Sequence, residues 1–266
     1  MKFKFSAIIL IAAIFFYSCS KEEKVDKGQG NIVFNFNHLI NSSTLLTDTL
    51  LYTNEAGNLY EVNDLKYFIS NVIFYENSGK IVKLIDLSGV HYIDISMPAT
   101  LSWNFPVKLP AGQYDSISFV FGMNESLNRS HAFVNPPEVY MAWPEVLGGG
   151  YHYLMLNGKW LNTSSLLTSL NFHMGIGQLY AGTTHNTDSI TAFVHNNFTV
   201  HLQTGSFQVT KDKTDTILLV MNVDSWFKTP HTWDFNLWGG MMMQNQDALN
   251  TAKENGFDVF TVGYIR

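Results

Sequence analysis

The sequence predicts an all-β fold, an antiparallel β-sandwich with one short C-terminal helix. Apolar residues alternate with polar or smaller ones in several segments, as Ile32, Phe34 and Phe36 do, and a period of two is typical of half-buried strands. Glycine- and proline-containing turns separate these segments at short intervals, which favours a sandwich of short strands. Helical periodicity is convincing only once, over residues 242–254.

The first 18 residues are predicted to be a lipoprotein signal peptide. Lys2 and Lys4 precede an apolar run over residues 5–17, and the small residue Ser18 follows. The run is shorter than the roughly 20 residues that cross a bilayer. Cys19, the single cysteine of the chain, stands where the cysteine of a bacterial lipobox stands. We therefore expect lipid to be attached to Cys19.

Residues 19–30 are predicted to be a lipidated tether, because they are polar, charged and contain glycine. Residues 20–23, Ser-Lys-Glu-Glu, resemble the tag that sends some Gram-negative lipoproteins to the outer face of the outer membrane. A plain solvated tether is the alternative, and both can be true. We expect an outer-membrane lipoprotein exposed at the cell surface and held by lipid through Cys19, with the sandwich domain over residues 31–266.

Within the domain, strands follow one another along the chain. The expected strands are 32–36, 66–75, 81–87, 116–121, 151–156, 166–174, 198–203, 216–223 and 257–264. Turn sequences lie at 77–79 and 110–112, and Gly256 is placed to end the helix. The stretch 123–150 shows no period but carries prolines, three consecutive glycines and Trp143, which predicts a long functional loop.

Composition and motifs exclude several function classes. Without residues 1–18, which hold two lysines, 14 basic and 22 acidic residues remain, a net charge of −8. An acidic domain is a poor nucleic-acid binder, so no nucleic-acid partner is expected. No Gly-x-Ser-x-Gly, His-Glu-x-x-His, phosphate-loop or EF-hand pattern is present, and no cysteine follows Cys19. We therefore expect a protein that is not an enzyme.

Histidines are the residues most able to carry chemistry here, since imidazole binds copper, zinc, iron and nickel. His38 extends the apolar face of the first strand, where a neutral imidazole needs a hydrogen bond or a metal. His173 stands at the end of another strand, before Gly175. A satisfied structural histidine is the alternative for each, and His152 has no spacing partner. Met241, Met242 and Met243 suggest soft copper ligation, but methionines at a helix start favour packing.

An ordered set of short segments resembles the MbnP-like copper-binding protein family. The segments are 35–38, 52–57, 65–72, 109–114, 141–143, 150–151, 172–175 and 255–260. The resemblance implies a β-sandwich that binds copper as its cofactor through two histidines and an oxidised tryptophan. Carried over to this chain, it implies His38 and His173 as ligands and Trp143 as the tryptophan converted to kynurenine. It also implies a partner, a di-haem peroxidase-type oxidase that performs the oxidation.

Two expectations follow from the competing interpretations. If the histidines bind copper, the affinity for copper should decrease when the pH drops below about 6.5, where ordinary imidazoles are protonated.

The alternative function is a surface glycan- or protein-binding lipoprotein, in which Trp103, Trp226, Trp233 and Trp238 stack on sugars. An exposed row of tryptophans favours glycan binding, whereas buried tryptophans and two converging histidines favour a metal. A structural component of a surface assembly is a third possibility.

Overall fold

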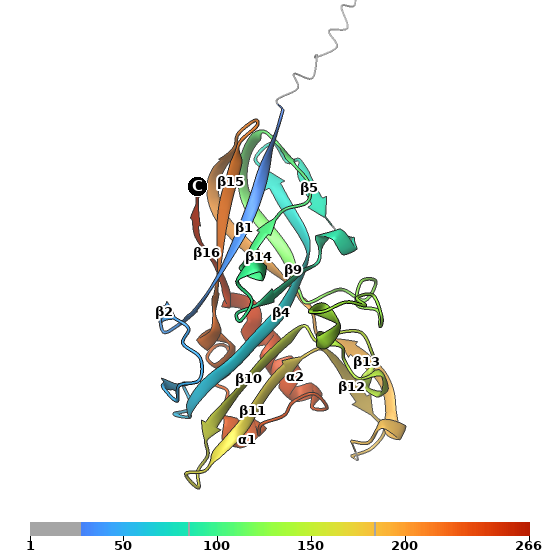
Figure 1. The fold of residues 1–266 in the computed structure, drawn as a ribbon. Coiled ribbons are helices and arrows are strands. Elements are labelled where there is room, and N and C mark those ends of the chain that lie inside the picture. The colour runs from blue at the N-terminus through green and yellow to red at the C-terminus, as the bar shows by residue number, and fades with distance from the viewer. Residues whose placement is uncertain (1–27, 85, 184) are drawn as a thin grey trace, which may run out of the picture.

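The alternating segments of the sequence form the strands of two facing sheets (Figure 1). The computed structural model describes residues 28–266 except 85 and 184, so the predicted signal peptide, Cys19 and residues 20–27 lie outside the described residues. The antiparallel sandwich and the short C-terminal helix, over residues 246–255, are confirmed. In the part of the chain that is described, no helix combines the length and the apolar character needed to cross a membrane.

The first sheet is built around the first strand of the domain. Its order is β16-β15-β1-β2, with β7 and β8 also paired to β1. Its strands are β1 (Gln29–Ile40), β2 (Ser43–Thr44), β7 (Ser102–Asn104), β8 (Leu109–Pro110), β15 (Thr214–Asn222) and β16 (Phe260–Ile265). The β1–β15 pair is parallel, with a register that runs from Asn31 opposite Thr214 to Leu39 opposite Asn222. The chain therefore brings its first strand beside one of its last.

The second sheet carries the functional candidates. Its order is β11-β10-β4-β9-β14, with β3, β5 and β6 also paired to β4. Its strands are β3 (Tyr52–Thr53), β4 (Leu59–Glu76), β5 (Ile81–Leu84), β6 (His91–Asp94), β9 (Gly112–Phe121), β10 (Leu154–Leu161), β11 (Leu167–Met174) and β14 (Phe198–Val209). A separate hairpin, β12 (Ile176–Tyr180) and β13 (Ile190–His195), follows β11.

Helices are short and lie in the connections. The α-helices are α1 (Phe235–Trp238) and α2 (Gln246–Asn255). The 3₁₀ helices are η1 (Leu87–Gly89), η2 (Pro98–Leu101), η3 (Glu138–Met141), η4 (Glu145–Leu147), η5 (Thr187–Ser189), η6 (Val223–Phe227) and η7 (Gly256–Asp258). Helix α2 begins four residues later than predicted, because the Asn245 side chain accepts from the Ala248 backbone N–H and caps it there. The segment 241–243 is consequently not helical.

Aromatic side chains fill the space between the sheets. Phe34 of β1 stacks on Phe74 of β4 with ring centroids 5.8 Å apart, which joins the two layers. Trp226 and Trp233 belong to this core and are 0% and 1% exposed. A second, smaller apolar cluster lies under the 123–150 segment and contains Phe68, Tyr92, Met123, Leu127, Met141 and Tyr151. The long loop is thus packed through a core of its own against the second sheet.

Candidate metal centre

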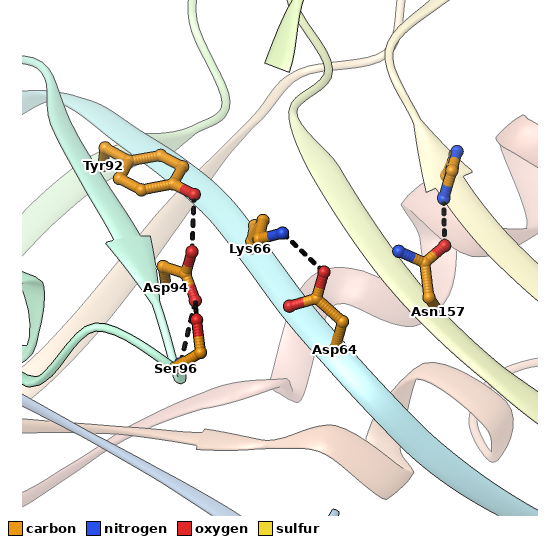
Figure 2. Close-up of polar contacts among 7 residues, drawn as sticks. Asp64, Lys66, Tyr92, Asp94, Ser96 and Asn157 are labelled. Atoms are coloured by element: carbon orange, nitrogen blue, oxygen red, sulfur yellow. Dashed lines mark hydrogen bonds and ion pairs between the residues drawn. The ribbon is translucent and has the colours of Figure 1, made fainter. Parts of the chain in front are cut away.

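A row of functional side chains crosses the outer face of the second sheet. The strand register sets Lys66 of β4, Met155 of β10 and His173 of β11 opposite one another. Their neighbours Tyr67, Leu154 and Met174 are fully buried in the core, so strand alternation turns the row away from it. Figure 2 shows Lys66 directed at Asp64, to which its Nζ donates over 2.6 Å, with Asn157 on the neighbouring strand.

His173 is held with one ring nitrogen free. Its Nε2 donates to the Asn157 Oδ1 over 2.8 Å, which leaves the lone pair of Nδ1 available. Burial, and then the nearby His152, lower the pKa of His173 from 6.5 to about 3. The ring is therefore neutral at pH 7, the state in which imidazole binds metals.

His152 is held in the complementary way by the long loop. Ala142 and Tyr151 form a β-bridge, and the next residue, His152, lies beside Met141, whose carbonyl oxygen accepts from His152 Nδ1 over 2.9 Å. Since a carbonyl can only accept, the proton is on Nδ1 and the lone pair of Nε2 is free. Burial lowers the pKa of His152 to about 4, so this ring is also neutral at pH 7.

The two imidazoles contact each other. Their ring centroids are 5.1 Å apart, and the rings are nearly perpendicular, at 87°. Imidazoles that share one ion through bonds of about 2 Å at a near-tetrahedral angle have ring centres about 5 to 6 Å apart. Each ring has its other nitrogen fixed by an oxygen acceptor, which is the support that metal-binding histidines typically have. The separation of the two rings and the hydrogen bonds of their outer nitrogens therefore fit a two-imidazole metal site.

Trp143 completes the cluster. Its indole meets the His152 ring at 4.6 Å between centroids, and its Nε1 donates to the Leu147 carbonyl over 3.2 Å. The indole is 2% exposed and packs on Gly175, where a Cβ would come within 2.5 Å of Cε3. Trp143, His152 and His173 thus form one contiguous group.

The structure does not bring His38 and His173 together, and the expectation that they are neighbours is wrong. His38 lies on β1 of the first sheet, is 5% exposed, and its Nε2 is 3.1 Å from the Tyr67 Oη. Tyr67 points into the core from β4, whereas His173 lies on the opposite face of that same sheet. The second sheet therefore separates the two rings. For His38, the alternative of a hydrogen-bonded structural histidine holds.

His152 is the residue that the sequence reasoning missed. Its signal was the three-glycine turn at residues 148–150, which lets the chain fold back so that Tyr151 bridges Ala142. That hairpin places His152 next to Met141 and in contact with the Trp143 indole. Within residues 28–84, 86–183 and 185–266, no group of three or more His, Cys, Asp or Glu could hold a metal ion.

Comparisons with known proteins give a family and a fold. A family model described as MbnP matches residues 29–245. Among solved structures, "MbnP from Methylosinus trichosporium" is similar with a TM-score of 0.53 and 12% sequence identity, over 88% of this chain and 98% of that chain. At that identity the likeness shows the fold alone. The comparison with curated proteins gave no match.

Proposed function

This chain belongs to the MbnP family, and from this premise we propose that it binds copper through His152 and His173, beside Trp143. The observation that carries the proposal is the contact at 5.1 Å between two neutral imidazoles, the buried His152 and the half-buried His173. Each keeps one lone pair free, and both free nitrogens are of the type that copper prefers. Membership of the family supports copper as the metal, and the geometry of the two imidazoles supports His152 and His173 as its ligands.

The function that these residues support is capture of the metal rather than turnover. The Met141 carbonyl and the Asn157 amide fix the ring orientations before any metal arrives, which lowers the entropy lost on binding. Burial keeps protons from competing for the free nitrogens at neutral pH. The proposed role is therefore a copper-binding protein that is not an enzyme.

Conversion of Trp143 to kynurenine by a di-haem peroxidase-type oxidase stays a prediction. What supports it is position, since the indole touches His152 and an oxidised ring there would lie beside the metal. Peptide mass mapping of protein purified from its native host tests it. An intact Trp143 in copper-loaded native protein would contradict it.

Attachment to the outer membrane through Cys19, with the domain at the cell surface, also stays a prediction. Its support is the sequence around Cys19. Metabolic labelling with a radioactive fatty acid tests the anchor, and Cys19→Ser should abolish the label. Protease treatment of intact cells tests the exposure at the surface.

The glycan-binding alternative loses its main support. All six tryptophans are described, and five are buried in the protein. The sixth, Trp238, stacks on Trp233 at 5.3 Å. No row of tryptophans is therefore available on the surface to stack on sugars.

Copper titration of the metal-free mature protein tests the proposal. His152→Ala and His173→Ala should each weaken copper binding at least tenfold, because one of two imidazole ligands is lost. His201→Ala, at an exposed histidine of β14, is the matched control and should keep the parent affinity. Unchanged affinity in both site variants, with the fold intact by circular dichroism, would overturn the proposal.

A further inference from the structure

A pocket of about 540 Å³ opens beside His173 and is not explained by the imidazole pair. Its lining residues are Leu147, Asn171, His173, His185, Met241, Met243, Gln244 and Asn245. The lining contains two thioethers and two imidazoles but no carboxylate. His152 does not line it, so the pocket is bordered by only one of the two imidazoles.

The methionines reach this pocket because their segment extends the edge of the second sheet. Asn171 of β11 and Met241 form a parallel β-bridge, and the Asn171 backbone N–H donates to the Gly240 carbonyl over 2.8 Å. Met243 lies at the start of the turn that follows this bridge, and it lines the pocket together with Met241. Met242, between them, is 2% exposed and belongs to the core.

Packing does not account for Met241. Its side chain is 76% exposed, although it is one of the residues that line the pocket. His185 closes another side, and its ring stacks on Tyr180 at 4.7 Å and 13°, which fixes where the imidazole lies. Thioether sulfur and imidazole are soft or borderline donors that select Cu(I), whereas Mg²⁺ and Ca²⁺ sites are built with carboxylates, and this lining offers only the amide oxygens of Asn171, Gln244 and Asn245.

We propose that Met241, Met243 and His185 form a second, Cu(I)-selective site, an entry site from which the metal reaches His173. The transfer of the metal to His173 rests on the proposed function, whereas Cu(I) binding by the pocket itself does not depend on it. Because His173 borders both the pocket and the imidazole pair, an ion can pass between them along one side chain. No change in oxidation state is needed for this step.

Titration of the full mature chain with Cu(I) against a chromophoric Cu(I) chelator tests the entry site. The parent should take up two Cu(I) ions, and the isosteric double variant Met241→Leu/Met243→Leu should take up one. The same variant should load the remaining site at least fivefold more slowly. Met97→Leu, at a 37% exposed methionine outside the pocket, is the matched control and should behave as the parent.

X-ray absorption distinguishes copper ligation by Met241 and Met243 from a role of these residues in packing alone. Sulfur scattering at about 2.3 Å is the expected thioether signature by analogy with other metal–sulfur bonds, and it should disappear in the double variant. His152→Ala separates the two proposals, because it removes the imidazole pair and leaves the pocket intact. If it still binds one Cu(I) through sulfur, the entry site stands without the pair. Unchanged stoichiometry, rate and sulfur signal in the methionine variant would overturn the entry site.

Discussion

The indole of Trp143 lies so close to the backbone of Gly175 that a Cβ on residue 175 would come within 2.5 Å of Trp143 Cε3. Gly175 follows β11 directly, two residues after His173. The end of the strand that carries one imidazole is therefore the surface against which the tryptophan packs. Since Trp143 also contacts His152, this single close approach links all three members of the candidate site.

Gly175→Ala should disturb both the fold and the site, because the added methyl group forces Trp143 to move. We expect a loss of about 1 to 3 kcal/mol in the free energy of unfolding, as for other overpacked cores, together with weaker copper binding. Denaturant unfolding measures the first effect and titration the second. In a Trp143→Phe background, Gly175→Ala should lower the free energy of unfolding by less than it does in the parent. An equal cost in both backgrounds would show that the contact is not the cause.

Asn157→Leu should weaken copper binding while leaving most of the fold intact. The variant removes the oxygen that accepts from His173 Nε2, so the ring orientation and tautomer are no longer fixed. Loss of such a supporting acceptor typically costs 10- to 100-fold in metal affinity. Asn157→Asp keeps an acceptor and should retain tight binding. If the leucine and aspartate variants bind copper equally well, the hydrogen bond has no role in the site.

Copper affinity should hold at lower pH than ordinary histidine ligands allow. The pKa of His152 is lowered to about 4 and that of His173 to about 3, mainly by burial. Protons therefore compete for the free nitrogens only near pH 4 and below, rather than from about pH 6.5 as the sequence alone suggests. Competition titrations at several pH values between 7.5 and 4 measure this. An affinity that already falls near pH 6.5 would contradict the assignment of His152 and His173 as ligands with lowered pKa values.

The metal-free protein should lose stability as the pH falls below about 6.5. His38 and His152 are 5% and 6% exposed, and burial lowers each pKa from 6.5 to about 4. Between these values the unfolded chain binds more protons than the folded one, so the free energy of unfolding decreases by up to about 1.4 kcal/mol per pH unit for each group. Urea unfolding at pH 7.5, 6 and 5 measures the slope. His38→Gln, which does not titrate, should make it shallower, and an unchanged slope would contradict the assignment.

Much of the fold could be predicted from local pattern. The period-two segments became β1, β9 and β14, and the proline-glycine turn precedes β9. The parallel pairing of β1 with β15 could not be predicted, because the partners are 183 residues apart at Asn31 and Thr214. The start of the helix was predicted too early, because the methionine run resembled a helical turn while Asn245 supplies the cap.

The candidate site was only half predictable. His173 and Trp143 are in one cluster, but periodicity could not show which face of which sheet each histidine occupies. His38 continues an apolar face and is accordingly buried against Tyr67. His152 has no strand pattern of its own, since a loop hairpin positions it. A loop hairpin of this kind leaves no periodic trace in the sequence.

The pairing of β1 with β15 also has a consequence for how the polypeptide is made. The strand β1, near the beginning of the domain, gains its long parallel partner only when residues 214–222 are available. Contacts between residues so far apart in sequence slow the search for the native topology. Newly synthesised chains should consequently remain sensitive to proteases until almost the whole polypeptide has emerged, and truncation after β14 should leave β1 paired only with the short strands β2, β7 and β8.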